Sequence, residues 1–251
     1  MRILLAGATG AIGKRLVPLL IDAGHDVVGT TRSRSKADTL RVSGVEPAIV
    51  DVFDARELSR MMLSIRPELV IHQLSDLPPG LDAARMAEGI RHNARMRKVG
   101  TQNLVAAAVD SGAHRLIAHS IAWGYAPGPE PHSEDDPLDI FAQGTRAITV
   151  EGVAILEQLT LSSPPLEGVV LRYGHLYGPG TGADAASQAP TLHVDAAAAA
   201  ALLAIDHARP GIYNIAEPSN YLSTDKARSE LAWDANFRVG MRVAARIGPE
   251  C

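Results

Sequence analysis

A glycine-rich turn near the N-terminus constrains the fold of this chain more than any other segment. The turn, Gly7-Ala8-Thr9-Gly10-Ala11-Ile12-Gly13, follows a short aliphatic strand and opens an amphipathic helix expected over 11–23. In that context one glycine permits a sharp turn, another lets the backbone approach a pyrophosphate, and the last lets helix and strand pack closely. Free N–H groups at the helix start then face the anion. An ordinary strand-to-helix turn is the alternative interpretation.

Short aliphatic runs alternate with helical patterns along the whole chain. Strands are expected at 2–6, 26–30, 46–50, 69–72, 115–119, 168–172 and 211–215, and helices at 11–23, 55–65, 82–111, 145–161, 195–208 and 224–231. Apolar strands separated by helices predict an α/β doubly wound parallel sheet, the Rossmann fold. We expect residues 1–172 to form the NAD(P)-binding domain. Residues 173–251 would form a small substrate-binding portion that returns elements to the sheet and is not an independent domain.

The end of the second strand indicates which dinucleotide the turn would bind. An NAD site usually has Asp or Glu there, to bind the ribose 2′-hydroxyl. This strand instead runs into Thr31, Arg32 and Ser33. Arginine makes planar, charge-assisted bonds to phosphate, so the segment predicts NADP(H), with NAD possible. A solvated basic loop that caps the next helix is the alternative.

Composition and charge exclude several classes of partner. The net charge is −4 and no basic run suggests a nucleic-acid partner. The alanine-rich run 196–205 is shorter than the roughly 20 residues of a membrane span, so it predicts a buried helix. The single cysteine, Cys251, excludes a disulfide framework and a cysteine-based metal site, and fits a cytoplasmic protein.

Later motifs resemble the extended or atypical short-chain dehydrogenase/reductases, in the branch of the NAD-dependent epimerase/dehydratase proteins. The residues that carry the resemblance are the glycine turn, Asp51-Val52, Asn93, Ser120, the segment RYGHLYGPG at 172–180, His193-Val194-Asp195 and Gly211–Ile215. The resemblance extends over nearly the whole chain. The glycine turn and RYGHLYGPG are its most specific parts.

The resemblance implies roles for matched positions. Asp51 and Val52 would border the adenine, and Leu74 and Ser75 would lie near the nicotinamide ribose. Ser120 matches the substrate-binding serine. The cofactor residues expected overall are Gly7, Thr9, Gly10, Ala11, Ile12, Gly13, Thr31, Arg32, Ser33, Asp51, Val52, Leu74, Ser75, Asn93, Tyr173 and Gly174.

The chain departs from the family at the catalytic Tyr-x-x-x-Lys. Aligning on Glu157 places Thr149 and Val153 at these positions, and counting forward from Ser120 places Thr145 and Thr149 there. No tyrosine or lysine occurs between Tyr125 and Tyr173. The part of the chain after the sixth strand is also shorter than in sugar-nucleotide enzymes of this branch.

Several polar residues allow a structural or a functional interpretation. His72 and Gln73 form a satisfied buried pair or border the cofactor. Neighbouring strand residues point to opposite faces, so one of His119 and Ser120 is expected to point away from the site. The pair His193 and Asp195 predicts a helix cap rather than a metal site, because no third ligand stands nearby.

Three functions are compatible with these features. The first is an NADP-dependent oxidoreductase acting on a small carbonyl or hydroxyl compound, as a monomer or homodimer. Ser120 would then hydrogen-bond the substrate, and Tyr125 or His175 would supply the proton. The second is a non-catalytic NADP-binding sensor or scaffold, which the missing tyrosine and lysine favour. The third is a sugar-nucleotide epimerase or dehydratase, which the short C-terminal part disfavours.

Overall fold

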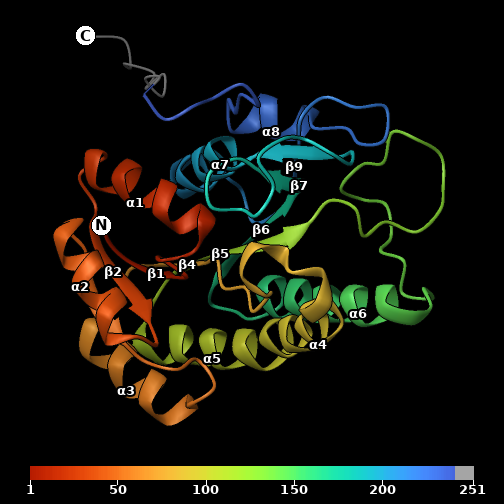
Figure 1. The fold of residues 1–251 in the computed structure, drawn as a ribbon. Helices are drawn as coiled ribbons and strands as arrows, with labels where there is room; N and C mark the ends of the chain where they lie inside the picture. Colours follow the sequence, from red (N-terminus) through yellow and green to blue (C-terminus); the bar gives the residue numbers. More distant parts are fainter. Residues whose placement is uncertain (241–251) are drawn as a thin grey trace, which may run out of the picture.

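The computed structural model describes residues 1–240 and contains a seven-stranded parallel sheet with helices on both faces (Figure 1). The predicted α/β Rossmann class is therefore confirmed. The sheet strands are β1 (Arg2–Ala6), β2 (Asp26–Thr31), β3 (Glu46–Ile49), β4 (Leu69–His72), β5 (Arg115–Ile121), β6 (Glu167–Tyr173) and β9 (Gly211–Ile215). The α-helices are α1 (Ala11–Asp22), α2 (Arg34–Val42), α3 (Ala55–Ile65), α4 (Met86–Arg95), α5 (Thr101–Ser111), α6 (Gly144–Leu161), α7 (Val194–His207) and α8 (Asp225–Glu230).

The strand order explains where a ligand can bind. The order is β3-β2-β1-β4-β5-β6-β9, and each neighbouring pair is parallel. The chain moves outward from β1 to β3 and then returns to β4 on the other side of β1. In open α/β sheets such a reversal leaves a crevice at the carboxyl ends of the strands. The glycine turn follows β1 at this crevice.

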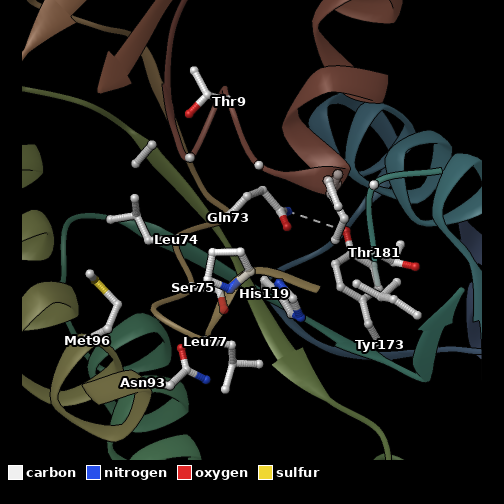
Figure 2. Close-up of a pocket in the computed structure, with 18 of the residues that line it drawn as sticks. Thr9, Gln73, Leu74, Ser75, Leu77, Asn93, Met96, His119, Tyr173 and Thr181 are labelled. Carbon is white, nitrogen blue, oxygen red and sulfur yellow. Dashed lines mark hydrogen bonds between the residues drawn. The ribbon is translucent and has the colours of Figure 1, made fainter. Parts of the chain in front are cut away.

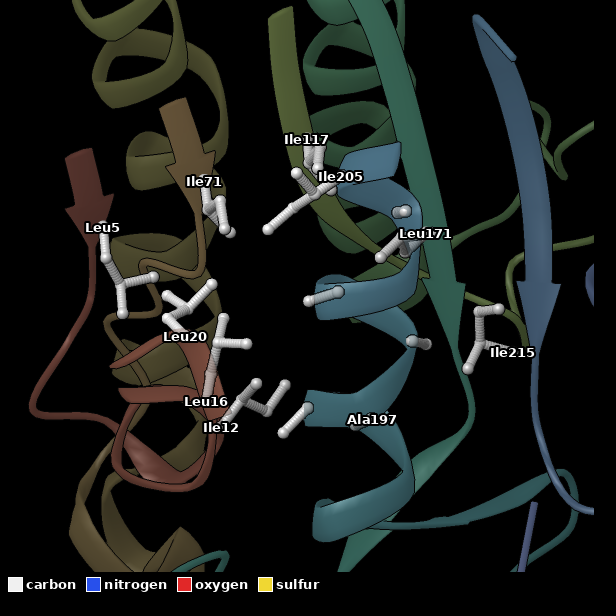
Figure 3. Packing of buried hydrophobic residues seen from close by; sticks show 14 of the residues in the cluster. Leu5, Ile12, Leu16, Leu20, Ile71, Ile117, Leu171, Ala197, Ile205 and Ile215 are labelled. Atoms are coloured by element: carbon white, nitrogen blue, oxygen red, sulfur yellow. The ribbon is translucent and has the colours of Figure 1, made fainter. Parts of the chain in front are cut away.

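One face of the sheet is covered by α1 and α7, which pack against each other. Leucine and isoleucine side chains from β1, β4, β5, β6 and β9 meet Ile12, Leu16 and Leu20 of α1 and Ile205 of α7 (Figure 3). The alanine-rich run predicted as a buried helix forms the centre of α7, and residues 196–201 are all buried. Small side chains allow α7 to approach both α1 and the sheet closely.

The opposite face is covered by α3, α5, α4 and α6 (Figure 1). Its core joins β1, β2 and β4 to α3 and α5 through side chains such as Leu4, Val70, Met62 and Leu104. Residues 173–240 return α7 and β9 to the sheet, where β9 pairs with β6. They also form a small parallel pair, β7 (His175–Tyr177) and β8 (Thr191–His193).

Two helical segments differ from the sequence prediction. The sequence did not predict α2. This helix is capped at its N-terminus by Ser33, whose hydroxyl accepts a hydrogen bond from the Lys36 N–H, at 3.5 Å. The single helix expected over 82–111 is divided. A 3-10 turn (Ala83–Arg85) precedes α4, and a π-turn, η3 (Met96–Gly100), separates α4 from α5. Such π-turns add a residue to the helix and often occur at functional sites.

Candidate cofactor and substrate site

A cavity of about 800 Å³ lies along the carboxyl ends of β2, β1, β4, β5 and β6. The glycine turn forms one wall, and the loop after β4 (residues 73–81) and the segment 174–188 form two others. Figure 2 shows Thr9 on the glycine turn, and Gln73, His119 and Tyr173 along the strand ends. The cavity is long enough in outline to span five strand ends, as an extended dinucleotide requires.

The three glycines of the turn have separate steric roles. Gly7 has a φ of 96°, and a Cβ there would lie 2.6 Å from the Gln73 carbonyl oxygen. A Cβ at Gly13 would lie 2.2 Å from the Gly7 oxygen, so this glycine permits α1 to pack on β1. A Cβ at Gly10 would meet only the Gly7 oxygen, at 3.2 Å. Gly10 therefore leaves space on the cavity side, where a phosphate would lie.

Most predicted cofactor residues lie on the cavity wall. The residues that do so are Gly7, Thr9, Gly10, Ala11, Ile12, Thr31, Arg32, Ser33, Val52, Leu74, Ser75, Asn93, Tyr173 and Gly174. Gly13 does not line the cavity and acts through helix packing. Asp51 is also not on the wall, because its carboxylate turns back to accept a hydrogen bond from the Phe53 N–H, at 3.0 Å. The prediction that Asp51 borders the adenine is therefore not supported, whereas its neighbour Val52 is in place.

The end of β2 provides a cationic wall. Arg32, Ser33 and Lys36 line the cavity there, and the Arg32 guanidinium lies 3.3 Å from Asp76 across the entrance. Lys14 of α1 lines it too. Lys36 was missed at the sequence level because its helix, α2, was not predicted. Among the described residues that line the cavity there are no carboxylates, so the Asp or Glu that usually binds the ribose 2′-hydroxyl in an NAD site is missing from the wall.

Gln73 and Asn93 hold the end of the cavity near β4. Gln73 is buried, its Nε2 donates a 3.5 Å hydrogen bond to the Tyr173 hydroxyl, and its Oε1 has no partner. A buried acceptor without a donor suits the carboxamide N–H of a nicotinamide. The Asn93 side chain accepts a 2.9 Å hydrogen bond from the Asp76 N–H and so fixes the loop after β4. The cavity thus fits a dinucleotide at the glycine turn, at the cationic wall and at Gln73.

His119 and Ser120 of β5 point to opposite faces, as expected. His119 faces the cavity and Ser120 does not, which is the reverse of what the predicted substrate contact of Ser120 requires. His119 lines the cavity and meets the Tyr173 ring edge-on, with ring centres 4.8 Å apart. Burial, followed by the charge of Arg97, lowers the pKa of His119 to about 3, so it is neutral near pH 7. Ser120 points away from the cavity. The sequence could not show which of the two residues faces inward, because alternation gives no absolute phase.

Ser120 belongs to a buried polar cluster, which corrects its predicted role as a substrate contact. Its hydroxyl donates a 2.5 Å hydrogen bond to Glu157 of α6. Glu157 also accepts bonds from Arg172 Nε and Nη2, at 2.9 and 2.7 Å. All three residues are buried. The cluster joins β5, β6 and α6 and holds a buried ion pair with its hydrogen bonds satisfied.

We expect Ser120→Ala to lower the free energy of unfolding by about 1–2 kcal/mol, because it removes one bond to a charged group. Its affinity for NADPH and any turnover should equal those of the wild type. Glu157→Leu should cost more, about 3–5 kcal/mol, because Arg172 is left buried without its partner. Urea unfolding and fluorescence titration with NADPH measure both effects. If Ser120→Ala lost turnover without losing stability, Ser120 would have to be assigned to the substrate site after all.

The two proton donors suggested by the sequence have different environments. The Tyr125 hydroxyl donates a 2.5 Å hydrogen bond to Asn214 in the interior, and burial raises its pKa to about 12. Tyr125 does not line the cavity, so the structure does not support it as a catalytic residue. His175 does line the cavity, with its ring stacked on Trp123 at 5.0 Å and 8°. Burial lowers the pKa of His175, so its neutral form dominates near pH 7.

A second cavity of about 450 Å³ adjoins the first and shares Trp123, His175 and Gln188 with it. Thr145 and Thr149 of α6 line this second cavity. These are the positions at which the Tyr-x-x-x-Lys pair was sought. The Thr149 hydroxyl donates to the Thr145 carbonyl at 3.2 Å. Neither side chain can replace a tyrosine activated by a lysine as an acid or base.

The remaining polar residues singled out in the sequence have structural contacts. His72 is buried, with Nε2 at 2.9 Å from the Thr101 hydroxyl and Nδ1 accepting from the Leu74 N–H. The His193 Nδ1 accepts a hydrogen bond from the Asp195 N–H at the start of α7, which confirms the predicted cap. Within residues 1–240, no helix is long and apolar enough to cross a membrane. Cys251 lies outside the described residues.

Comparison with known protein families decides the relationship suggested by the motifs. Residues 3–192 match the model of the NAD dependent epimerase/dehydratase family. The chain belongs to this family. The glycine turn, Gly7–Gly13, lies near the start of the matched region and forms one wall of the cavity.

Two curated relatives have different named activities. The chain is 38% identical over 245 residues to a Streptomyces 3-diazoavenalumate denitrifying reductase, covering 86% of this chain and 76% of the relative. It is 31% identical over 147 residues to a UDP-glucose 4-epimerase of Mycolicibacterium smegmatis, covering 55% of this chain and 45% of that protein. The likeness to the reductase thus includes the C-terminal part, whereas the match to the epimerase does not extend over the whole of either chain.

Solved structures of epimerases share the fold. The UDP-glucose 4-epimerase of Thermotoga maritima with UDP-glucose has a TM-score of 0.74 at 18% identity, over 95% of both chains. The Thermus thermophilus UDP-glucose 4-epimerase in complex with NAD has a TM-score of 0.68 at 22% identity, over 93% of this chain and 84% of that one. At these identities the likeness concerns the fold.

Proposed function

We propose that this protein is an NADP(H)-dependent reductase that delivers a hydride to a small electrophile. The observation that carries the proposal is the cavity that joins the cationic wall at Arg32 and Lys36 to the aromatic wall at Trp123 and His175. Bound NADPH would supply the hydride at the inner end of this cavity. The residues of the chain would bind the dinucleotide, exclude water and orient the acceptor.

Three features of the cationic wall favour NADPH over NADH. Arg32 and Lys36 provide two positive charges, and the Ser33 hydroxyl lies between them in the sequence. Charge-assisted bonds to a 2′-phosphate are stronger than neutral bonds. The described residues that line the cavity include no Asp or Glu, and Arg32 would exchange the carboxylate in contact with the wall, Asp76, for the phosphate. The family name and several structural neighbours refer to NAD. The proposed preference for NADP therefore rests on the residues of the cationic wall in this chain.

The missing tyrosine and lysine restrict the chemistry that the site can perform. Removing hydride from an alcohol requires a base for the hydroxyl proton, and reducing a ketone requires an acid for the developing alkoxide. Thr145 and Thr149 supply neither, and His175 is neutral and stacked on Trp123. Epimerisation at a sugar carbon needs the same acid and base, so the site does not favour the epimerase alternative.

An acceptor that needs no protonation of an oxygen fits the site better. One relative is named as a denitrifying reductase of a diazo compound. Replacing a diazonium group by hydride forms one C–H bond, breaks one C–N bond and releases N₂, so no acid is consumed. We therefore propose an aromatic or conjugated diazonium compound as the acceptor class, with the ring lying against Trp123 and His175.

The test is to incubate the protein with NADPH deuterated at C4 and a panel of diazonium, quinone, aldehyde and ketone compounds. We expect oxidation of NADPH with the diazonium compounds, release of N₂ and deuterium in the new C–H bond. Reactions without protein, and with a Gly10→Val variant, correct for direct reduction in solution. If NADPH binds tightly but no acceptor is reduced, a non-catalytic NADP-binding protein becomes the better interpretation.

The dependence of kcat on pH separates the two kinds of chemistry. The pKa of His119 is lowered to about 3 and that of His175 is also lowered, both by burial first. His119 is therefore neutral throughout pH 6.5–8, and for His175 the neutral form predominates over this range. Hydride transfer to a diazonium group should give a kcat that varies by less than about twofold over this range. A kcat that falls as the pH rises through about 7 would reveal a required general acid and would contradict the proposal.

A further inference from the structure

Arg97 is a cation at the inner end of the cavity, where a bound dinucleotide would place no phosphate. It lies on the π-turn η3, lines the cavity and is partly buried. No ion pair or hydrogen bond joins its guanidinium to another of residues 1–240. The nearby carboxylate of Glu157 is already bound by Ser120 and Arg172. A charged group removed from water without a partner is costly, and binding sites commonly contain such groups.

The position of Arg97 along the sheet separates it from the phosphates of a bound dinucleotide. Its neighbours include His72 at the end of β4 and His119 on β5. The glycine turn follows β1, and the cationic wall follows β2. With strands about 4.8 Å apart, β5 lies roughly 10 Å from β1 and 15 Å from β2. The pyrophosphate and the 2′-phosphate are therefore served by Lys14, Arg32 and Lys36, and Arg97 is left over.

The groups around Arg97 do not neutralise its charge. Burial and then the charge of Arg97 lower the pKa of His72 to about 4. His119 is likewise neutral near pH 7. No carboxylate lines the cavity among the residues that the structure describes. The Glu157 carboxylate attracts the Arg97 guanidinium but is bound directly by Arg172, so the inner end presents a positive charge with no direct partner among residues 1–240, beside neutral aromatic side chains.

Those aromatic side chains define the shape of the ligand. The stacked pair Trp123 and His175 lines both cavities, and the Tyr173 and His119 rings lie on the wall of the first. Flat faces of this kind favour planar ligands. A guanidinium binds a carboxylate through two parallel hydrogen bonds, which also fixes its direction.

We propose that Arg97 binds the carboxylate of the substrate, and that the substrate is a small planar carboxylic acid. This inference rests on the proposed function, because it names the substrate class for the same site. Anchoring an acid at Arg97 would place its conjugated part along the aromatic wall, next to the nicotinamide end marked by Gln73.

The test measures binding of inert probes to the NADP⁺-loaded protein by calorimetry. Cinnamate is the planar carboxylate, and cinnamamide is its uncharged counterpart. We expect Arg97→Gln to weaken cinnamate binding roughly 10- to 100-fold and to leave the weak binding of cinnamamide unchanged. Arg97→Lys should restore part of the affinity. Arg91→Gln, an exposed arginine on α4, is the matched control and should bind both probes like the wild type.

Separate measurements distinguish the ways in which this inference could fail. The NADPH affinity of Arg97→Gln should stay within about threefold of the wild type, and its melting temperature should not fall, because no ion pair is lost. A loss of NADPH affinity, with cinnamate unaffected, would show that the cation serves the cofactor and would overturn the proposal. Failure of the wild type to bind cinnamate would also overturn it. If the wild type binds cinnamate through Arg97 but reduces no acceptor, the carboxylate site stands and the proposed reductase activity fails.

Discussion

Gly10→Val is expected to abolish NADPH binding in a protein that remains folded. A Cβ at Gly10 would contact only the Gly7 oxygen, at 3.2 Å, so a shift of that carbonyl by a few tenths of an ångström would accommodate a side chain. The added isopropyl group would occupy the space in which the backbone approaches the pyrophosphate. We expect the dissociation constant to rise by at least about 1,000-fold, which corresponds to roughly 4 kcal/mol. Fluorescence titration with NADPH measures the affinity, and circular dichroism without cofactor measures the fold.

Two further variants show that the effect belongs to the cavity side of the turn. Gly13→Val should fail to fold, because its Cβ would lie 2.2 Å from the Gly7 oxygen and 2.7 Å from the Ala8 carbonyl carbon. Ala23→Val adds a branched side chain at an exposed position near the end of α1 and should leave both affinity and stability unchanged. A folded Gly10→Val protein that binds NADPH like the wild type would show that this turn is not the phosphate site.

Replacing both Arg32 and Lys36 by alanine is expected to remove the preference for NADPH. Each cation can form a charge-assisted bond to the 2′-phosphate, and Arg32 is more than half exposed, so the lower end of the usual range applies. A loss of about tenfold for each residue gives roughly 100-fold weaker NADPH binding for the pair. NADH binding should change by less than about threefold, because NADH has no phosphate at that position. Calorimetric titration with both dinucleotides measures the change in preference.

Arg34→Ala is the matched control for the cationic wall. Arg34 is exposed at the start of α2 but does not line the cavity. Its replacement removes one positive charge, as replacement of Arg32 or Lys36 alone would. It should weaken NADPH binding only slightly, and less at higher salt. Equal affinity of the wild-type protein for NADPH and NADH would contradict the proposed role of Arg32 and Lys36.

Short-range patterns in the sequence were sufficient to predict the sheet and the glycine turn between β1 and α1. The strands are apolar on both faces, and the glycine spacing has a steric requirement that the structure meets at Gly7 and Gly13. Helix α2 was missed because it has few apolar positions and begins at a serine cap inside a basic segment. Lys36 therefore went unrecognised. The predicted helix over 82–111 was divided, because periodicity alone does not reveal a π-turn.

The sequence by itself determined the family, the glycine turn after the first strand, the absence of an acid after β2 and the absence of the Tyr-x-x-x-Lys pair. Only the tertiary structure decided that His119 faces the cavity while Ser120 enters a buried ion-pair cluster, and that Tyr125 points into the interior. The orientations of His119 and Ser120 depend on the absolute phase of β5 against its neighbours. That phase is set by packing of β5 against α6 and β6, whose contacts Ser120–Glu157 and Arg115–Glu167 join residues 37 and 52 positions apart. The position of Arg97 was likewise decided by tertiary structure, because it brings the turn η3 beside His72 of β4 and His119 of β5, with no ion pair to Arg97 among residues 1–240.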